Sequence, residues 1–334
     1  MNEYDTIRDI LSRFRRGPDP VNAPFESDAE FVRIGSQLWG LTLDEFSPAE
    51  DLFTLEDPRR LGSNLVTATL SDLLAAGVEP RFFLHALSLP RMPDPDFIRR
   101  LCDGMALTLD RAGCALCGGD LGTADPWRYT GFAMGPVVSP APLTRRLPPE
   151  ALTLWITGTL GDFNAAALTG QPTPELEPRL TEAAAAHAAA VAGIDTSGGL
   201  ADALWMLHGA SPGIRFEVDL SAIPYAAGVR EICAGAGVPP EAALFGGAGE
   251  YELLFAFPRA PSGEFFSRLR ATGFTAIGRA FPAPEPGVDF ISPDGRRLPM
   301  RRPPPCPRSA AETKEHARQA VMAAAQLLSG RASP

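Results

Sequence analysis

A proline-rich segment near the middle of the chain is the feature that most constrains how it can fold. Residues 139–150, SPAPLTRRLPPE, have no periodic apolar face, whereas the sequence on both sides alternates helix and strand patterns. Both flanks can bury a core, because the 334 residues are 45% hydrophobic. We therefore expect an N-terminal domain at 1–138, a linker at 139–150, a C-terminal domain at 151–300, and a basic hinge with a last helix at 301–334.

Helix and strand patterns are mixed within both halves. Asp57 followed by Pro58 is typical of a helix start, and Gly77 of a helix end. Some neighbouring strand patterns have no helix between them, which favours an α+β architecture over a doubly wound parallel sheet. The expected helices include 3–14, 57–77, 94–113 and 179–193, and the expected strands include 40–46, 81–90, 114–119, 127–138, 151–158 and 251–257.

Charge and composition exclude several classes of function. A net charge of −10 argues against sequence-independent nucleic-acid binding, which depends on clustered Lys and Arg, and favours a small-molecule partner. No segment has the roughly 18 apolar residues of a membrane span, and the N-terminus is charged rather than signal-like. We expect a cytoplasmic protein with no nucleic-acid and no membrane partner.

The five cysteines do not indicate a disulfide framework, because their number is odd and the chain is long. Cys114 and Cys117 form the C-x-x-C pair of the stretch CALCGG. A zinc site would need two further ligands, and no second pair or nearby histidine supplies them. We interpret this stretch as a buried strand with structural thiols.

Aspartates recur beside small residues at strand ends and turns, which is where a nucleotide site with several Mg²⁺ ions needs its ligands. Each also has a simpler interpretation. Asp44 and Asp120 are also typical of turns, Asp72 of a solvated helix face, and Asp195 of a helix N-cap. The candidate metal ligands are Asp28, Asp44, Asp72, Asp120 and Asp195.

Four stretches, SDLLAAGVEP, GGD, IDTSGGL and GGAGEYELLF, occur in this order with characteristic separations. Together they resemble the thiamine-monophosphate kinase branch of the aminoimidazole ribonucleotide synthetase (PurM-like) superfamily, over about residues 22–280. The family's Gly-Asp-Asp-Ala-Ala motif is reduced to ESDAEF, which leaves Asp28, and its Thr-Asp strand end corresponds to Asp44. Its Ser-Asp helix corresponds to Ser71 and Asp72.

The resemblance implies a two-domain α+β fold in which the N-terminal sheets of two protomers pair into a dimeric β-barrel, with a C-terminal α/β sandwich domain. It implies a homodimer that binds ATP and Mg²⁺ in its N-terminal domains and passes a phosphoryl group to a small phosphorylated acceptor, thiamine monophosphate, to give thiamine diphosphate. It places phosphate contacts at the glycines and chemistry at three further residues. The implied sets are Gly118, Gly119, Gly198 and Gly199 for phosphate, Asp28, Asp44, Asp72, Asp120 and Asp195 for metal, and Asp195, Ser197 and Glu250 for catalysis.

This chain departs from the family pattern at three acids. Gly198 replaces the second aspartate of Asp-Ile-Ser-Asp-Gly-Leu, and Ser27 replaces one aspartate of the N-terminal motif. In the last motif Gly249 replaces a glutamate, and Glu250 stands for the following aspartate. Three hypotheses remain: another acceptor with fewer metals, a nucleotide-binding dimer that is catalytically silent, or compensation by nearby acids. The candidates for compensation are Glu45, Glu50, Asp51 and Asp202.

Basic and histidine side chains are weaker candidates. Arginines near the C-terminus could recognise an acidic acceptor, although a solvated hinge is the favoured interpretation. His85 alternates with Phe83 and Leu87 on one strand face, which favours a buried, hydrogen-bonded histidine over a catalytic one. His187 is expected to be an ordinary helix-face residue. The arginines concerned are Arg296, Arg297, Arg301 and Arg302.

Overall fold

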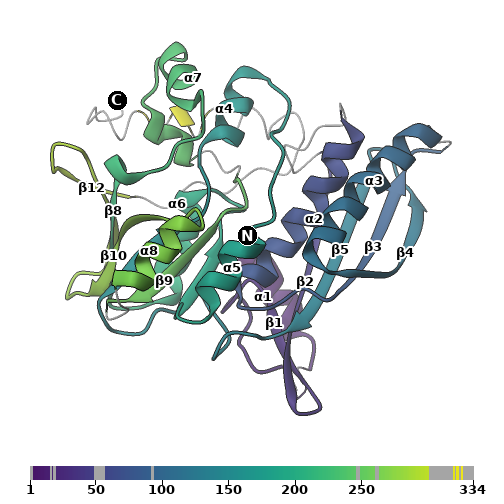
Figure 1. The fold of residues 1–334 in the computed structure, drawn as a ribbon, viewed down its shortest axis with the longest axis horizontal. Helices are drawn as coiled ribbons and strands as arrows, with labels where there is room; N and C mark the ends of the chain where they lie inside the picture. The colour runs from purple at the N-terminus through teal and green to yellow at the C-terminus, as the bar shows by residue number, and fades with distance from the viewer. Residues whose placement is uncertain are drawn as a thin grey trace.

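The computed structural model shows a mixed α+β fold with two separate sheets, as the sequence predicts (Figure 1). Five strands form one sheet in the order β1-β2-β5-β3-β4, and seven form the other in the order β12-β11-β8-β10-β6-β9-β7. The structure describes residues 3–15, 17, 20–48, 57–91, 94–245, 249–259, 263–300, 319, 321–322 and 325. Glu50, Asp51, Arg301, Arg302, Cys306 and most of the expected C-terminal helix lie outside the described residues.

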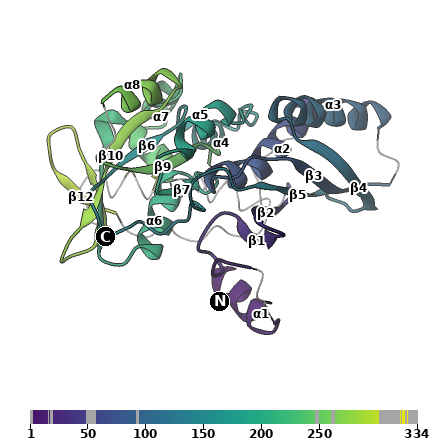
Figure 2. The same ribbon diagram turned by 60° about the horizontal axis from the view of Figure 1, so that its bottom comes forward.

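The five-stranded sheet is built by the first half of the chain. Its pairs are antiparallel except for the parallel pair β3 and β4. Helices α2 and α3 cover one face, and no described element covers the other (Figure 2). Its elements are α1 (Glu3–Ser12), β1 (Glu30–Ile34), β2 (Gln37–Phe46), α2 (Pro58–Ala75), β3 (Phe82–Leu89), α3 (Pro95–Ala112), β4 (Ala115–Thr123) and β5 (Arg128–Pro136).

Helix α2 begins where the sequence predicts. The Asp57 carboxylate accepts a hydrogen bond from the Arg59 amide at 3.2 Å, and Pro58 occupies the first turn. The helix is buried along most of its length because α3 packs closely on it. A Cβ on Gly62 would stand 2.0 Å from the Leu101 carbonyl oxygen, so only glycine permits this helix crossing.

The seven-stranded sheet carries helices on both faces. Leu154 and Leu254 pack with α6 on one side, whereas Trp155 and Phe255 pack with α5 and α8 on the other. This alternation is why its central strands are buried throughout. Its elements are β6 (Leu152–Ile156), α4 (Asp162–Thr169), α5 (Leu180–His187), β7 (Ala192–Asp195), α6 (Leu200–Ala210), β8 (Ile214–Asp219), η1 (Leu220–Ala222), α7 (Val229–Gly235), η2 (Pro240–Phe245), β9 (Leu253–Pro258), α8 (Gly263–Ala271), β10 (Thr275–Pro282), β11 (Gly287–Ile291) and β12 (Arg297–Pro299).

The C-terminal end of α2 joins the two halves. Leu74 belongs to the same buried cluster as Phe255, and the strand β7 passes so close that a Cβ on Gly193 would meet the Ala75 carbonyl oxygen at 2.3 Å. His187 is not a plain helix-face residue, because it is buried here with its Nε2 2.7 Å from the Leu74 carbonyl oxygen. These contacts hold β7 beside the C-terminal end of α2.

Two expectations for β3 and β4 need correction. The strand at 114–119 forms, but β4 lies at the sheet edge and is exposed along its length except for Gly118, so it is not a buried strand. Cys114 is buried and Cys117 exposed, and both are free thiols. His85 stacks on the Tyr129 ring at 5.8 Å, yet its buried Nδ1 has no hydrogen-bond partner.

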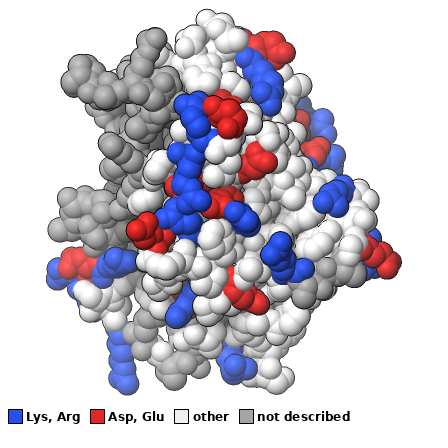
Figure 3. All heavy atoms as spheres, turned by 90° about the vertical axis from the view of Figure 1, so that its left-hand side faces the viewer, with Lys and Arg blue, Asp and Glu red and all other residues white. Residues whose placement is uncertain are grey.

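The outer end of the seven-stranded sheet carries a ladder of ion pairs on the face that α5 and α8 leave open. Glu217 accepts hydrogen bonds from Arg279 and Arg297 at 2.5 Å each, and Asp289 is paired with Arg215 and Arg297. Figure 3 views this end of the molecule and shows acidic and basic side chains side by side. Arg297 is thus engaged within the sheet, and Arg296 pairs with Asp294 at 2.7 Å.

No described helix is both long enough and apolar enough to cross a bilayer.

Candidate functional site

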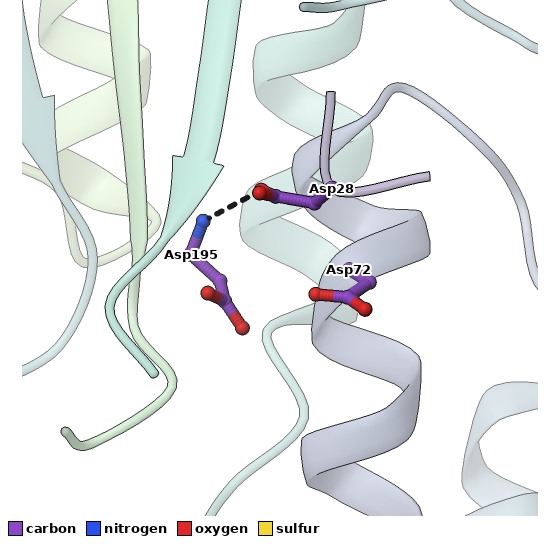
Figure 4. Close-up of side chains that lie close together, drawn as sticks. All are labelled: Asp28, Asp72 and Asp195. Atoms are coloured by element: carbon purple, nitrogen blue, oxygen red, sulfur yellow. Dashed lines mark hydrogen bonds between the residues drawn. The ribbon is translucent and has the colours of Figure 1, made fainter. Parts of the chain in front are cut away.

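Three of the five predicted aspartates converge between α2 and the end of β7. Asp28, Asp72 and Asp195 each offer a carboxylate oxygen, and these atoms all lie within 4.8 Å of one another. Figure 4 shows the Asp72 carboxylate, on α2, and the Asp195 carboxylate, after β7, facing the same space, with Asp28 reaching in from the loop before β1. We call these three residues the acid cluster.

Asp195 owes its position to a strand end and two serines. Its Oδ1 accepts hydrogen bonds from the Ser197 amide at 3.1 Å and the Ser197 hydroxyl at 2.8 Å. Its Oδ2 accepts from the Ser71 hydroxyl of α2 at 2.6 Å. Asp195 is not a helix N-cap, because α6 starts after Gly199. The simpler interpretation of Asp195 is therefore wrong.

Asp28 is tied to both halves of the chain. Its Oδ2 accepts the Asp195 amide at 3.0 Å, and its Oδ1 accepts the Arg145 guanidinium at 2.8 Å through Nε and 2.5 Å through Nη2. Its side chain is 1% exposed. Burial raises the pKa of Asp28 to about 6, against the opposing effect of Arg145, and the Asp195 charge adds to the rise.

Asp72 lies on the α2 face that meets the sheet rather than on a solvated face. The Thr42 hydroxyl of β2 donates to its Oδ2 at 2.5 Å. Burial raises the pKa of Asp72 well above its usual value, and the charges of Asp44, Asp195 and Asp28 raise it further. Asp44, two residues after Thr42 on β2, thus contributes its charge from the edge of the cluster.

The acid cluster has the donor set of a hard divalent cation. Its carboxylates are shielded from water, and their negative charges repel one another. Among the described basic side chains, Arg145 is the one that donates hydrogen bonds to the cluster, at Asp28. Mg²⁺ takes oxygen ligands and is held by one or two carboxylates together with substrate phosphates. The observed residues therefore fit Mg²⁺.

Asp120 does not join the acid cluster. The strand register aligns Asp120 with Ala86, Thr130 and Glu45 in one cross-strand row. Side chains of one such row share a sheet face, and the adjacent row, which contains Asp44 and His85, faces α2. Asp120 is exposed on the opposite face. A Cβ on Gly119 would meet the His85 ring at 2.8 Å, so this glycine makes room for His85.

Glu250 lies in a second acidic group. Its Oε1 accepts the Gly161 amide at 2.7 Å, and its burial, with the charge of Asp162, raises its pKa well above the usual value. Burial also raises the pKa of Asp162, whereas Glu252 is held by Arg179 at 2.7 Å. The described contacts of Glu250 are thus made with this second acidic group.

Two of the departures from the family pattern lie where a side chain would meet neighbouring atoms closely. A Cβ on Gly249 would stand 1.5 Å from the Thr196 carbonyl oxygen, so no side chain fits there. A Cβ on Gly198 would stand 2.6 Å from a carboxylate oxygen of Asp202. Gly199 has φ +83°, which favours glycine. Gly247 and Ala248 lie outside the described residues.

Sequence reasoning missed the side chains that orient the cluster. Arg145 lies in the expected linker, and Thr42 lies in an expected strand. The available signal for Arg145 was a basic residue inside an otherwise proline-rich connection. Ser27, where the family has an acid, instead donates its hydroxyl to the Leu143 carbonyl at 2.9 Å and so anchors the same connection.

Comparison with known proteins relates most of the chain to one group of enzymes. Residues 26–137 match the family model described as AIR synthase related protein, N-terminal domain. Thiamine-monophosphate kinase of Pyrococcus horikoshii is 29% identical over 290 residues, which cover 84% of this chain and 88% of that protein. The chain is similar to thiamine-monophosphate kinases over most of its length.

Two further matches delimit this relationship. The Archaeoglobus fulgidus thiamine-monophosphate kinase is 30% identical over 135 residues, which cover 40% of this chain and 44% of that protein. The solved structure of AaThiL complexed with AMPPCP and TMP superposes with a TM-score of 0.73 at 22% identity, covering 89% of this chain and 94% of that one. At that identity the superposition shows a common fold.

Proposed function

We propose that this protein is an ATP- and Mg²⁺-dependent phosphotransferase that converts thiamine monophosphate to thiamine diphosphate. The observation that carries the proposal is the acid cluster, three carboxylates within 4.8 Å in a relative of thiamine-monophosphate kinases. The related ThiL structure contains AMPPCP and TMP, a combination that matches the proposed pair of substrates. Clustered buried carboxylates have little structural use without a cation, because they repel one another.

In this proposal the side chains act mainly by positioning the substrates, because phosphoryl transfer requires little covalent chemistry from the protein. Asp28, Asp72 and Asp195 would hold Mg²⁺, with Asp44 beside them. Bound Mg²⁺ would neutralise charge on the phosphates of ATP. Ser197 keeps the Asp195 carboxylate in place through its 2.8 Å hydrogen bond.

The backbone amides near Gly118, Gly119, Gly198 and Gly199 are the proposed phosphate contacts. Gly199 precedes the first turn of α6, where free amides favour an anion. Glu250, whose pKa burial raises well above its usual value, is proposed as a proton-holding group at the edge of the site.

The proposed organisation has an N-terminal ATP- and Mg²⁺-binding domain at 1–138, a linker at 139–150 and a C-terminal domain at 151–300. A homodimer is proposed because the open face of the five-stranded sheet is apolar. Leu43, Phe132 and Leu84 form one cross-strand row there, and Leu43 is 64% and Leu84 41% exposed. An exposed apolar patch of this kind marks an association surface.

A second protomer on this face would complete a β-barrel and would cover Asp120, which supports a role for Asp120 at a shared site. Light scattering should give a dimer for the wild-type chain and a monomer for Leu43→Asp. A monomeric wild-type protein at micromolar concentration would contradict the dimer without affecting the acid cluster.

The activity is tested by incubating the protein with Mg-ATP and thiamine monophosphate and measuring thiamine diphosphate by chromatography. Product that is lost in Asp72→Asn and retained in Asp103→Asn, an exposed acid on α3, would support the proposal. The absence of product with wild-type protein, while calorimetry shows Mg-ATP binding, would overturn the acceptor.

A second candidate is a nucleotide-binding dimer with another acceptor or with no turnover. The observation that favours it is Gly249, where the contact with Thr196 leaves no space for the family's acid. Release of ADP with a different phosphate-bearing acceptor would identify an enzyme with another acceptor. Tight Mg-ATP binding with no ADP formation under any condition would identify a protein without turnover.

A further inference from the structure

Gly198 and Asp202 compete for one space. Gly198 follows the turn that holds Asp195, and Asp202 lies in the first turn of α6. A Cβ built on Gly198 would stand 2.6 Å from Oδ2 of Asp202 and 3.0 Å from its Cγ. Carbon and oxygen atoms that are not bonded do not approach so closely, so a side chain at 198 would require the Asp202 carboxylate to move.

This space borders the acid cluster through a short chain of contacts. Ser197 donates both its amide and its hydroxyl to Oδ1 of Asp195, and Gly198 is the next residue. The Asp202 carboxylate is packed on the backbone of Gly198 and is half-buried. It therefore stands at the turn from which the Asp195 carboxylate is directed.

We propose that Asp202 supplies a carboxylate to the metal and phosphate site, in the place that an acid at position 198 would serve. The inference rests on the proposed function, because it assumes that the acid cluster binds a divalent cation. The negative charge is preserved while its stem moves four residues along the chain. Mg²⁺ retains several of its water ligands in proteins, so a carboxylate outside the acid cluster can act on it through a bound water.

The backbone at Gly198 supports this exchange. Unlike Gly199, Gly198 does not have a positive φ, so its conformation does not require glycine. The reason for glycine is the Asp202 carboxylate itself. Moving the acid back to position 198 while removing it from 202 should therefore be tolerated, with a shift of a few tenths of an ångström from the remaining Cβ at 202.

The alternative role for Asp202 is to stabilise helix α6. An acidic residue in the first turn of a helix stabilises the helix dipole, whatever the adjacent loop binds. The two roles make different predictions for the exchange variant. A carboxylate at 198 would restore cation binding at the loop, whereas a contribution to the first turn of α6 would stay lost once residue 202 is alanine.

The test measures Mn²⁺ binding to full-length protein in the presence of AMPPCP, by the electron paramagnetic resonance signal of free Mn²⁺, so that turnover is not required. Asp202→Asn should weaken Mn²⁺ binding about 10-fold. Gly198→Ala should weaken it similarly, because the added methyl group displaces the carboxylate. The matched control is Asp103→Asn, which removes an exposed acid from α3 and should leave the affinity unchanged.

The decisive variant is Gly198→Asp combined with Asp202→Ala, which should recover most of the lost Mn²⁺ affinity. Unchanged affinity in Asp202→Asn would overturn the inference and leave the proposed function intact if wild-type protein still forms thiamine diphosphate. Loss in Asp202→Asn without recovery in the double variant would assign Asp202 to helix stability. Wild-type protein that binds neither Mn²⁺ nor AMPPCP would instead overturn the proposed function, and the inference with it.

Discussion

Buried acids occur in two regions of this protein, and their surroundings differ. At the outer end of the seven-stranded sheet, Glu217 and Asp289 are 5% and 3% exposed and are paired with arginines. Between the two sheets, Asp28, Asp72 and Asp195 face one another, and Arg145 contacts only Asp28 among them. Burial is similar in the two regions, but charge compensation is not.

The difference shows how to separate a structural acid from a functional one in this fold. The ladder satisfies each buried carboxylate within the described chain, so its acids need no ligand. The hollow beside it, of about 580 Å³, is lined by Thr153, Glu217 and Phe281 among others and by no member of the acid cluster. The negative charge of the acid cluster exceeds the positive charge of Arg145, and a bound cation would balance it. This property is expected of a site for Mg²⁺ and phosphates.

The largest expected effect is the loss of turnover in Asp72→Asn. Removing a carboxylate that holds a metal in phosphoryl transfer should reduce kcat at least about 100-fold, which is several kcal/mol of transition-state stabilisation. Glu217→Gln, the matched change in the ladder, should leave kcat unchanged. Formation of thiamine diphosphate is the measurement, and equal activity of the two variants would break the distinction between the regions.

Arg145 should stabilise the folded protein because its guanidinium compensates the negative charge of Asp28. Arg145→Met leaves the buried Asp28 carboxylate without its guanidinium, which should lower the free energy of unfolding by about 3 kcal/mol at pH 8 without metal. Mg²⁺ with AMPPCP should then raise the melting temperature more in this variant than in wild type. Calorimetric melting curves give both values. A smaller ligand-induced shift in the variant would show that Arg145 helps to bind the ligand instead.

The pH dependence of stability should be weaker without the Asp72 carboxyl group. Because the folded-state pKa values of Asp28 and Asp72 are raised, the folded protein binds protons that the unfolded chain releases. The free energy of unfolding of the metal-free protein should fall by about 1 to 3 kcal/mol as the pH rises from 4 through 6. Asp72→Asn should fall less and be the more stable protein at pH 8. Urea unfolding at pH 5 and pH 8 tests this, and a wild-type protein that gains stability over this interval through these groups would contradict the assignment.

The smallest effect should come from the ladder. Glu217→Gln leaves the exposed guanidinium groups of Arg279 and Arg297 in contact with water, so the free energy of unfolding should fall by only about 1 kcal/mol. The measurement is urea unfolding with and without Mg²⁺ and AMPPCP. The loss should be the same in both conditions, and a dependence on the ligand would connect the ladder to the site.

Local pattern accounts for the parts of the site that could be predicted. The start of α2 at Asp57 and Pro58, and the strand that ends at Asp195, follow from short-range signals that act within a few residues. The motifs also named Asp28, Asp72 and Asp195 among five candidate metal ligands. The placement of Asp120 could not be predicted, because the face of an edge strand depends on its register with β3.

Local signals predict the α+β class, most of the helices and strands, and the aspartates at strand ends, because propensity, capping and alternation act over a few residues. Which acids meet depends on the tertiary fold, since the Asp28 and Asp195 contact joins residues 167 positions apart and the Ser71 and Asp195 contact joins residues 124 apart. The fold also brings Arg145 to Asp28 and the Asp202 carboxylate against Gly198. These outcomes depend on the packing of α2 against β7, which brings distant backbone segments into contact.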